Sequence, residues 1–224
     1  GLGDLYKRQG QDDVGLRLAE INEQQYIQVV DYSDAGNVLA EHPLAEVSEI
    51  SIIGTETNET LRIEDGLQVP VSFDGGGGSD TLRGPDADSD WNITGTGSGT
   101  VTPTGFAGIT FSGIENLAGG TGQDTFTLAD VAFLGVTIDG GDGSDTVRGS
   151  DSDTAWDLTG VNSGTVTVTD SSPTPFTGIE NLIGGGGEDT FTIPDALSLG
   201  GTIDGGDGAD LLDYSGWTTG VTVN

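Results

Sequence analysis

The chain has 224 residues, of which 37 are acidic and only six are basic, and its formal net charge is −31. It contains 40 glycines and no cysteine, so a disulfide scaffold and a thiolate metal site are excluded. No apolar stretch approaches the ~18 residues that span a bilayer, and the charge repels nucleic-acid phosphates and anionic membranes. We therefore expect no nucleic-acid partner and no membrane insertion, and we expect cations as the natural partners of this surface.

The first 70 residues are the least regular part of the chain. Residues 1–20 start with Gly-Leu-Gly, without an initiator methionine or a signal-peptide core, which indicates an internal or processed fragment. They lack the glycine motif found later, so we expect a terminal cap or the end of a preceding module. Residues 21–70 follow the later strand pattern loosely and are expected to form degenerate solenoid coils, with strands near 26–30 and 37–39.

A 65-residue repeat organises the rest of the chain. The segment 74–84 returns 65 positions later with two changes, and it begins a third time at residue 204. Gly-Ile-Glu-Asn-Leu at 113–117 also returns after 65 positions, at 178–182. We therefore assign residues 71–135 to repeat 1, residues 136–200 to repeat 2, and residues 201–224 to a truncated third repeat.

A shorter period lies inside each repeat. Strings with one apolar residue between two polar ones recur at intervals that average just under 22 residues, separated by glycine-rich turns. Such alternation is typical of β-strands. The pattern predicts an all-β parallel β-solenoid, similar to a β-helix or β-roll, with about 22 residues per coil and three coils per repeat. Trp91 and Trp156 share a repeat position and are expected to stack over its corners.

Five segments match Gly-Gly-x-Gly-x-Asp, at 75–80, 119–124, 140–145, 184–189 and 205–210. Glycine permits backbone angles closed to other residues, so these turns can aim carbonyl oxygens at one point, and the Asp adds an anionic oxygen. Because Ca²⁺ takes six to eight oxygen ligands, two stacked turns are needed for one site. Two pairs of segments lie one coil apart, which predicts two calcium sites. Their expected ligand residues are Gly119, Gly120, Gly122, Asp124, Gly140, Gly141, Asp142, Gly143 and Asp145 in the first site, and Gly184, Gly185, Gly187, Asp189, Gly205, Gly206, Asp207, Gly208 and Asp210 in the second.

A weaker third site would combine Gly75, Gly76, Gly78 and Asp80 with Glu59. The alternative for all the loops is structural: the glycines make tight turns, and the Asp side chains cap them by accepting backbone N–H bonds. Stacked carboxylates about 5 Å apart repel by several kcal/mol at an effective dielectric near 20, and a bound divalent ion reverses that repulsion. This favours the metal interpretation.

These motifs resemble the repeats-in-toxin (RTX, hemolysin-type) calcium-binding repeat family, as found in giant bacterial surface adhesins. The resemblance covers residues 71–224, and it implies bound Ca²⁺ and a location that is secreted or at the extracellular cell surface. The chain departs from the family pattern, in which units run in tandem at nine residues with calcium on both edges. Here the coil is longer, and the motif is expected on one edge only.

The remaining residues argue against catalysis. His42 is the only histidine and lies outside the repeats, so no acid–base pair or nucleophilic site can be assembled. We expect a non-catalytic, calcium-stabilised rod, spacer or fibre element of a large adhesin or matrix protein. Its expected partners are calcium ions, further coils of the same chain or identical subunits in a filament, and a surface glycan or cell target. The alternative is an ice- or glycan-binding solenoid, suggested by Thr-x-Thr ranks that Arg83 and Arg148 interrupt.

Overall fold

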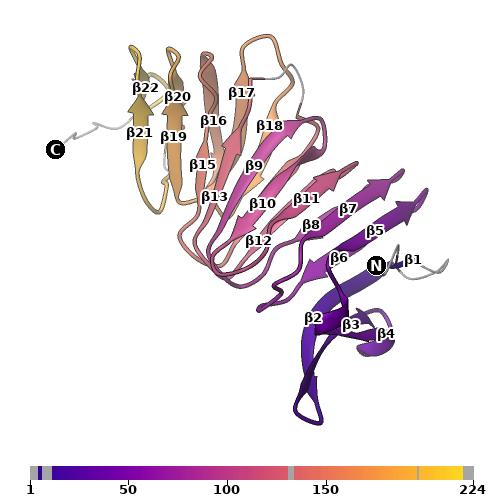
Figure 1. Ribbon diagram of the computed structural model, residues 1–224. Helices are drawn as coiled ribbons and strands as arrows, with labels where there is room; N and C mark the ends of the chain where they lie inside the picture. Colours follow the sequence, from indigo (N-terminus) through magenta and orange to yellow (C-terminus); the bar gives the residue numbers. More distant parts are fainter. Residues whose placement is uncertain (1–4, 7–11, 131–133, 196, 219–224) are drawn as a thin grey trace.

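The structure, a computed structural model, describes residues 5–6, 12–130, 134–195 and 197–218. In this part the chain is all-β apart from one 3₁₀ turn, η1 (Leu44–Glu46), and its strands stack along a curved rod (Figure 1). The first strands are β1 (Leu5–Tyr6), β2 (Asp13–Ile21), β3 (Gln24–Asp31), β4 (Asn37–Pro43), β5 (Ile50–Thr55) and β6 (Thr60–Ile63).

Two successive sets of strands follow. Repeat 1 contains β7 (Val71–Gly76), β8 (Thr81–Arg83), β9 (Ser89–Gly95), β10 (Ser98–Pro103), β11 (Ile109–Ser112), β12 (Asn116–Gly120) and β13 (Asp124–Leu128). The later strands are β14 (Thr137–Gly141), β15 (Thr146–Arg148), β16 (Thr154–Gly160), β17 (Ser163–Val168), β18 (Thr174–Thr177), β19 (Asn181–Gly185), β20 (Thr190–Thr192), β21 (Ile203–Gly206) and β22 (Leu211–Asp213).

The strands form two sheets, between which the chain alternates. The 10-stranded sheet, here sheet A, has the order β1-β5-β7-β11-β10-β9-β13-β15-β19-β21. The 12-stranded sheet, here sheet B, has the order β22-β20-β16-β17-β18-β14-β12-β8-β6-β2-β3-β4. Most neighbours pair in parallel, as β12 does with β8 and β14. The arrangement is therefore solenoid-like, with two largely parallel sheets.

Each repeat also contains an antiparallel meander, which an all-parallel solenoid lacks. Strands β9, β10 and β11 pair antiparallel in sheet A, and β16, β17 and β18 do so in sheet B. Only two residues separate β9 from β10, which suffices for a hairpin but not for a crossing to the opposite sheet. The expectation of three coils per repeat is therefore wrong: residues 100–102, expected in a coil of their own, lie in the middle strand of a meander.

The number of passes between sheets explains how repeats stack. We call each stretch of chain that lies in one sheet a pass, and we count a meander as one pass. Repeat 1 then has five passes: β7 in sheet A, β8 in sheet B, β9–β11 in sheet A, β12 in sheet B and β13 in sheet A. Because five is odd, repeat 2 starts in sheet B with β14, and its meander also lies in sheet B. Equivalent strands thus exchange sheets, and equivalent loops exchange edges of the rod, from each repeat to the next.

Strands β2 to β6, in the region expected to hold a cap and degenerate coils, repeat part of the strand arrangement of the later units. Strands β2, β3 and β4 make a third antiparallel meander, and β2 pairs in parallel with β6 as β9 does with β13. The Arg62 guanidinium donates to both carboxylate oxygens of Asp13, each at 2.7 Å, and so ties the meander to β6. Residues 1–4 and 7–11 of the expected cap, and 219–224 at the other end, lie outside the described residues.

Alternate side chains of both sheets build one continuous apolar core. Trp91 stacks on Phe126 with 5.2 Å between ring centroids, and Trp156 stacks on Phe191 at 5.5 Å. The parallel register of β9 with β13 and of β16 with β20 places these rings side by side. Both tryptophans are fully buried between the sheets and do not lie at the corners, so that expectation is corrected. Aromatic pairs of this kind contribute about 0.5–1.5 kcal/mol beyond area burial.

Candidate metal centre

The glycine loops stack in pairs, as the registers of their flanking strands require. In the middle pair Gly120 lies opposite Gly141, where β12 pairs with β14. The stacked pairs are 54–59 with 75–80, 119–124 with 140–145, and 184–189 with 205–210. The middle pair joins sheet B to sheet A, whereas the other two join A to B. The pairs therefore alternate between both edges of the rod, which corrects the expectation of a single edge.

The first glycine of each loop makes room for the carboxylate that closes the loop. A Cβ atom on Gly119 would lie 2.3 Å from Asp124 Oδ2, and one on Gly140 would lie 2.6 Å from Asp145 Oδ2. Both distances are far below van der Waals contact. The second glycine serves the backbone: Gly141 has a φ of +93°, a region that favours glycine. The motif spacing thus folds the Asp side chain inward, beneath its own loop.

The paired carboxylates meet through a backbone amide. Asp145 Oδ1 accepts a hydrogen bond from Asp124 N–H at 2.8 Å. The same bond runs from Asp189 N–H to Asp210 Oδ1 at 3.0 Å. One oxygen of each second Asp therefore caps the neighbouring loop, as the structural alternative describes, while the other oxygen is left for a different partner.

Several of these carboxylate oxygens are buried without a hydrogen-bond donor. They are both oxygens of Asp124, Oδ2 of Asp145 and Oδ2 of Asp189. The three side chains are 0 to 1% exposed. A buried charge that lacks a partner costs several kcal/mol, so these oxygens mark positions where a cation or a proton is required.

The pKa values of these buried acids are raised in the folded protein. Burial raises the pKa of Asp124 to about 7, and the Asp145 carboxylate adds to the rise. Trp91 and Ser89 moderate the shift, although neither makes a hydrogen bond of normal geometry to Asp124. Burial also raises the pKa of Asp145 to about 6, against the lowering effect of the Asp124 amide. Burial raises the pKa of Asp189 as well, while the Thr154 hydroxyl lowers it.

The pair formed by Glu59 and Asp80 shares the backbone cap of the other two pairs. Asp80 Oδ1 accepts a hydrogen bond from Glu59 N–H at 2.7 Å, and both side chains are buried. A Cβ atom on Gly54 would lie 2.7 Å from Glu59 Oε2, as the equivalent glycines do from their own Asp. Glu59 therefore takes the position that Asp124 and Asp189 hold in the later repeats. The Glu59 carboxylate differs from that of Asp124, because its Oε2 accepts from Thr55 N–H at 2.8 Å and its Oε1 accepts from the Thr55 and Thr57 hydroxyls.

The third residue of loops 140–145 and 205–210 does not turn its side chain beneath the loop. Asp142 and Asp207, both expected as ligand residues, have exposed side chains. Their backbone amides donate to the stacked loop, from Asp142 to the Gly120 carbonyl at 3.0 Å and from Asp207 to the Gly185 carbonyl at 2.9 Å. Their contribution to the site in this structure is therefore made by the main chain.

Two further acids, Glu115 and Glu180, lie beside the glycine loops although they are outside the Gly-Gly-x-Gly-x-Asp motif. Asp80 N–H donates to Glu115 Oε2 at 2.8 Å, and Asp145 N–H donates to Glu180 Oε2 at 2.8 Å. Both glutamates belong to the Gly-Ile-Glu-Asn-Leu segments. The 65-residue return of these segments was the available signal, but only the register shows that they lie beside the glycine loops.

The loop pair 184–189 with 205–210 has an additional contact inside the core. Thr154 donates to Asp189 Oδ1 through its amide, at 2.8 Å, and through its hydroxyl. Trp156 Nε1 in turn donates to Thr154 Oγ1 at 2.6 Å. The chain Trp156–Thr154–Asp189 therefore couples the buried aromatic stack to the loop carboxylate.

The available ligands are hard oxygens, which suit Ca²⁺. Each loop pair supplies two acids of its own, together with the carbonyl oxygens of two glycine-rich turns. In the described ranges, no group of three or more His, Cys, Asp or Glu side chains is arranged to hold a metal ion by itself. A bound ion at these positions would thus take part of its coordination from the main chain.

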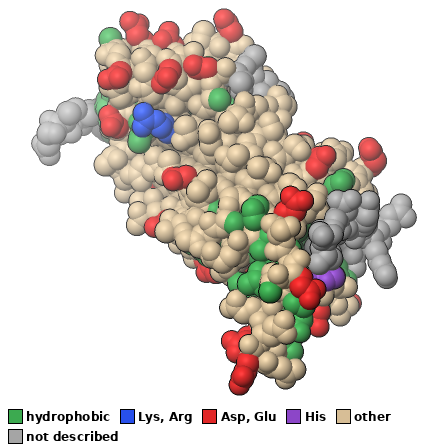
Figure 2. All heavy atoms as spheres, in the orientation of Figure 1, with side chains coloured by type: hydrophobic (Ala, Val, Ile, Leu, Met, Phe, Trp, Pro, Cys, Tyr) green, Lys and Arg blue, Asp and Glu red, His purple; other side chains and the backbone are tan. Residues whose placement is uncertain are grey.

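Figure 2 shows Asp and Glu side chains scattered over one face of the molecule beside very few basic ones, in line with 37 acidic and six basic residues in the sequence. Such a surface attracts cations.

The described residues contain no helix with the length and apolar character of a membrane span.

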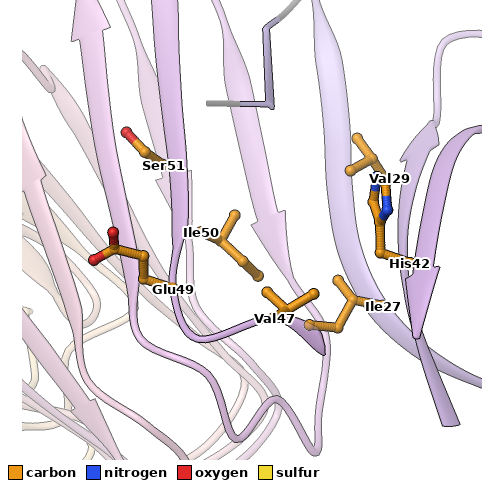
Figure 3. A pocket seen from close by; sticks show the side chains of 7 residues that line it. All are labelled: Ile27, Val29, His42, Val47, Glu49, Ile50 and Ser51. Carbon is orange, nitrogen blue, oxygen red and sulfur yellow. The ribbon is translucent and has the colours of Figure 1, made fainter. Parts of the chain in front are cut away.

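A small pocket near His42 offers no catalytic arrangement. Ile27, Val47 and Ile50 face one another in it, and they separate His42 on one side from Glu49 on the other (Figure 3). The two titratable groups of the lining therefore do not form an acid–base pair.

Comparison of this chain with protein-family models, with curated proteins and with solved structures finds no match.

Proposed function

We propose that this chain is a non-catalytic, calcium-stabilised structural segment of a large secreted or cell-surface protein, acting as a rod, spacer or fibre element. One observation carries the proposal: the stacked Asp124 and Asp145 carboxylates are buried and have oxygens without donors. A divalent cation between the loops would supply the missing partner and turn mutual repulsion into attraction.

The residues that would hold calcium follow from the stacking. Asp124 and Asp145 would provide carboxylate oxygens in one site, and Asp189 and Asp210 in another, each completed by carbonyls of the paired loops. Glu59 and Asp80 would form a third. The resemblance to RTX repeats supports this assignment, although the loop pairs here are spaced one per repeat unit on alternating edges.

Calcium would then be coupled to folding. The unfolded chain has no preformed site, so binding free energy adds directly to the stability of the folded state. Repulsion within a chain of net charge −31 acts in the opposite direction. We propose that the segment gains its rigidity outside the cell, where it would join further coils or identical subunits and present the parent protein to a glycan or cell target.

The threonine ranks favour this role over ice binding. In sheet A, β13 carries Thr125 and Thr127, but its neighbour β9 places Asp90 and Asn92 directly beside them. On the other side Thr127 lies beside Arg148 of β15. The outward face therefore alternates in charge and size, whereas an ice-binding face needs a regular array.

Thermal unfolding of the whole chain with calcium, and with a chelator, tests the proposal. We expect Ca²⁺ to raise the midpoint, with about 2.7 kcal/mol per site at a hundredfold excess over Kd. Asp145→Asn and Asp210→Asn should each remove part of this gain. The matched control is Asp90→Asn, which removes one exposed charge from β9 and should leave the calcium effect unchanged.

Magnesium at the same ionic strength separates specific binding from screening, because Mg²⁺ demands a smaller, octahedral site. Equal midpoints in calcium, magnesium and chelator would reject the calcium site while leaving the fold intact.

A further inference from the structure

The C-terminal end of the described rod presents two strand edges. In the described ranges no strand pairs with the outer edge of β21 or of β22, which end sheets A and B. Leu211 is 55% exposed and Leu212 is 39% exposed, whereas Val147, which is equivalent to Leu212 in repeat 2, is 0% exposed. An exposed apolar strand edge is a template for pairing with a further strand.

The earlier repeats show what covers the equivalent edges. Strands β7 and β8 are covered by β11 and β12, and strands β14 and β15 are covered by β18 and β19. In both cases the two covering strands are consecutive and belong to one short segment, 109–120 or 174–185. Each segment is a β-arch: one strand for sheet A, a corner, and one strand for sheet B, with the sheets exchanged in repeat 2.

The corner of the arch is the Gly-Ile-Glu sequence. Gly113 and Gly178 have φ values of +63° and +62°, which allow the sharp change of direction. Ile114 and Ile179 follow them and are 0% exposed, so each corner is anchored in the core. The corner fits because its glycine has no side chain: a Cβ on Gly178 would lie 3.1 Å from Gly141 N.

Specific hydrogen bonds also join the arch to the glycine loop that it covers. The Glu115 carboxylate accepts from Asp80 N–H, and the Asn116 side-chain amide donates to the Asp80 carbonyl at 3.2 Å. The Asp80 carbonyl also accepts the backbone N–H of Asn116 at 2.9 Å.

Repeat 2 makes the same three contacts with Asp145, through Glu180 and Asn181. In both repeats the Glu-Asn pair of the arch therefore binds the main-chain N–H and carbonyl groups of the motif Asp in the covered loop.

We infer that the end formed by β21 and β22 binds a β-arch of the pattern Phe-(Thr/Ser)-Gly-Ile-Glu-Asn-Leu-x-Gly-Gly, supplied by a further repeat unit of this class. The repeat register places the Phe opposite Ile203, the Asn opposite Leu211 and the Leu opposite Leu212. The Glu carboxylate of the arch accepts from Asp210 N–H, and its Asn donates to the Asp210 carbonyl.

This inference deepens the proposed role as a rod, and it rests on that role only for the presence of further repeat units. The recognition itself depends on strand register and not on calcium. It makes extension sequence-specific, because an arch without the Glu-Asn pair leaves the Asp210 main chain unsatisfied.

The test uses the whole chain in saturating Ca²⁺ and a 12-residue peptide with the sequence of residues 174–185, Thr-Pro-Phe-Thr-Gly-Ile-Glu-Asn-Leu-Ile-Gly-Gly. We expect saturable binding by calorimetry and slower hydrogen exchange at the amides of β21 and β22. Peptides with Glu180→Ala or Asn181→Ala should bind about tenfold more weakly, because each loses a hydrogen bond to a partly buried partner. These changes lie in the peptide, so the fold of the chain is not affected.

A peptide tethered to the chain tests the inference even where the free peptide binds too weakly to be measured. Joining the same peptide to the C-terminus through a long flexible linker raises its effective concentration to the millimolar range. The tethered wild-type arch should protect the β22 amides, and the Glu180→Ala, Asn181→Ala double variant should not.

Equal protection by both tethered forms, or protection by neither, would overturn the inference. Self-association of the untethered chain that the peptide does not inhibit would also overturn it, in favour of a second copy as the occupant. Calcium dependence is read separately, from melting curves without peptide, so either proposal can fail alone.

Discussion

At the scale of single residues, the chain buries carboxylates beneath glycine loops and leaves part of their hydrogen-bonding capacity unmet. Asp124 is the extreme case, since both its oxygens are buried without a donor. Its pKa is raised to about 7 by burial and by the neighbouring Asp145. In the absence of a cation such a group retains its proton in the folded state at a pH where the unfolded chain has lost it.

This has a definite consequence for calcium-free protein. Because the folded pKa lies above the unfolded value, the free energy of unfolding is highest at or below pH 4 with respect to this group. It falls as the pH rises from about 4 to about 7, by an amount on the order of 4 kcal/mol. Urea unfolding in chelator across this range measures the slope.

The variant Asp124→Asn should reduce that slope, since one titrating group is gone, while the raised pKa values of Asp145 and Asp189 preserve the remainder. Asp157→Asn, which removes an exposed charge from β16, is the matched control and should preserve it. A calcium-free slope that is the same in the parent and in Asp124→Asn would show that Asp124 is not the group responsible.

At the scale of elements, the meanders depend on tight turns with left-handed residues. The turn between β17 and β18 contains Asp170 with a φ of +61°, and the equivalent position of repeat 1 is Gly105 with a φ of +82°. A Cβ on Gly105 would meet no atom within 4 Å, so this position is limited by backbone conformation and not by space.

We therefore expect Asp170→Gly to stabilise the protein by about 0.5–1 kcal/mol, because glycine enters the left-handed region without the steric cost of a Cβ. The denaturation midpoint should rise at an unchanged m-value. Asp170→Asn separates the effect of charge, since it removes the carboxylate but keeps the Cβ. A gain with Asn equal to that with Gly would assign the effect to charge.

At the scale of the whole molecule, the odd number of passes per repeat controls which segments can be removed. Deleting one full repeat, residues 136–200, brings residue 201 into the place of residue 136 and leaves every strand with an equivalent neighbour. Deleting only the meander, residues 150–178, leaves β15 and β19 consecutive in sheet A without a crossover, a connection that parallel strands cannot make.

The larger deletion should therefore fold and the smaller one should not. We expect the chain without 136–200 to unfold cooperatively with a reduced m-value, in proportion to the surface lost. The chain without 150–178 should show neither a cooperative transition nor a native β signal by circular dichroism. Cooperative folding of the smaller deletion would disprove the five-pass topology.

Much of this architecture was accessible from the sequence. Residues such as Leu82, Val147 and Phe126 alternate with polar neighbours, and alternation alone identifies a half-buried strand. The stacking of loop 119–124 on loop 140–145 follows from a spacing that matches one complete coil. Glu115 could not be assigned to the site, because its partner Asp80 lies 35 residues away and only strand register brings them together.

By itself, the sequence determined the β class, the 65-residue repeat and the positions of the glycine loops, because these depend on local patterns of side-chain size and polarity. Only the tertiary structure decided that the strands at Thr100 and Thr165 turn back as hairpins, that successive repeats exchange sheets, and that the motif carboxylates accept backbone amides from the adjacent pass. Those outcomes depend on how two sheets pack across a common core, and residues far apart in the chain contribute to that packing together.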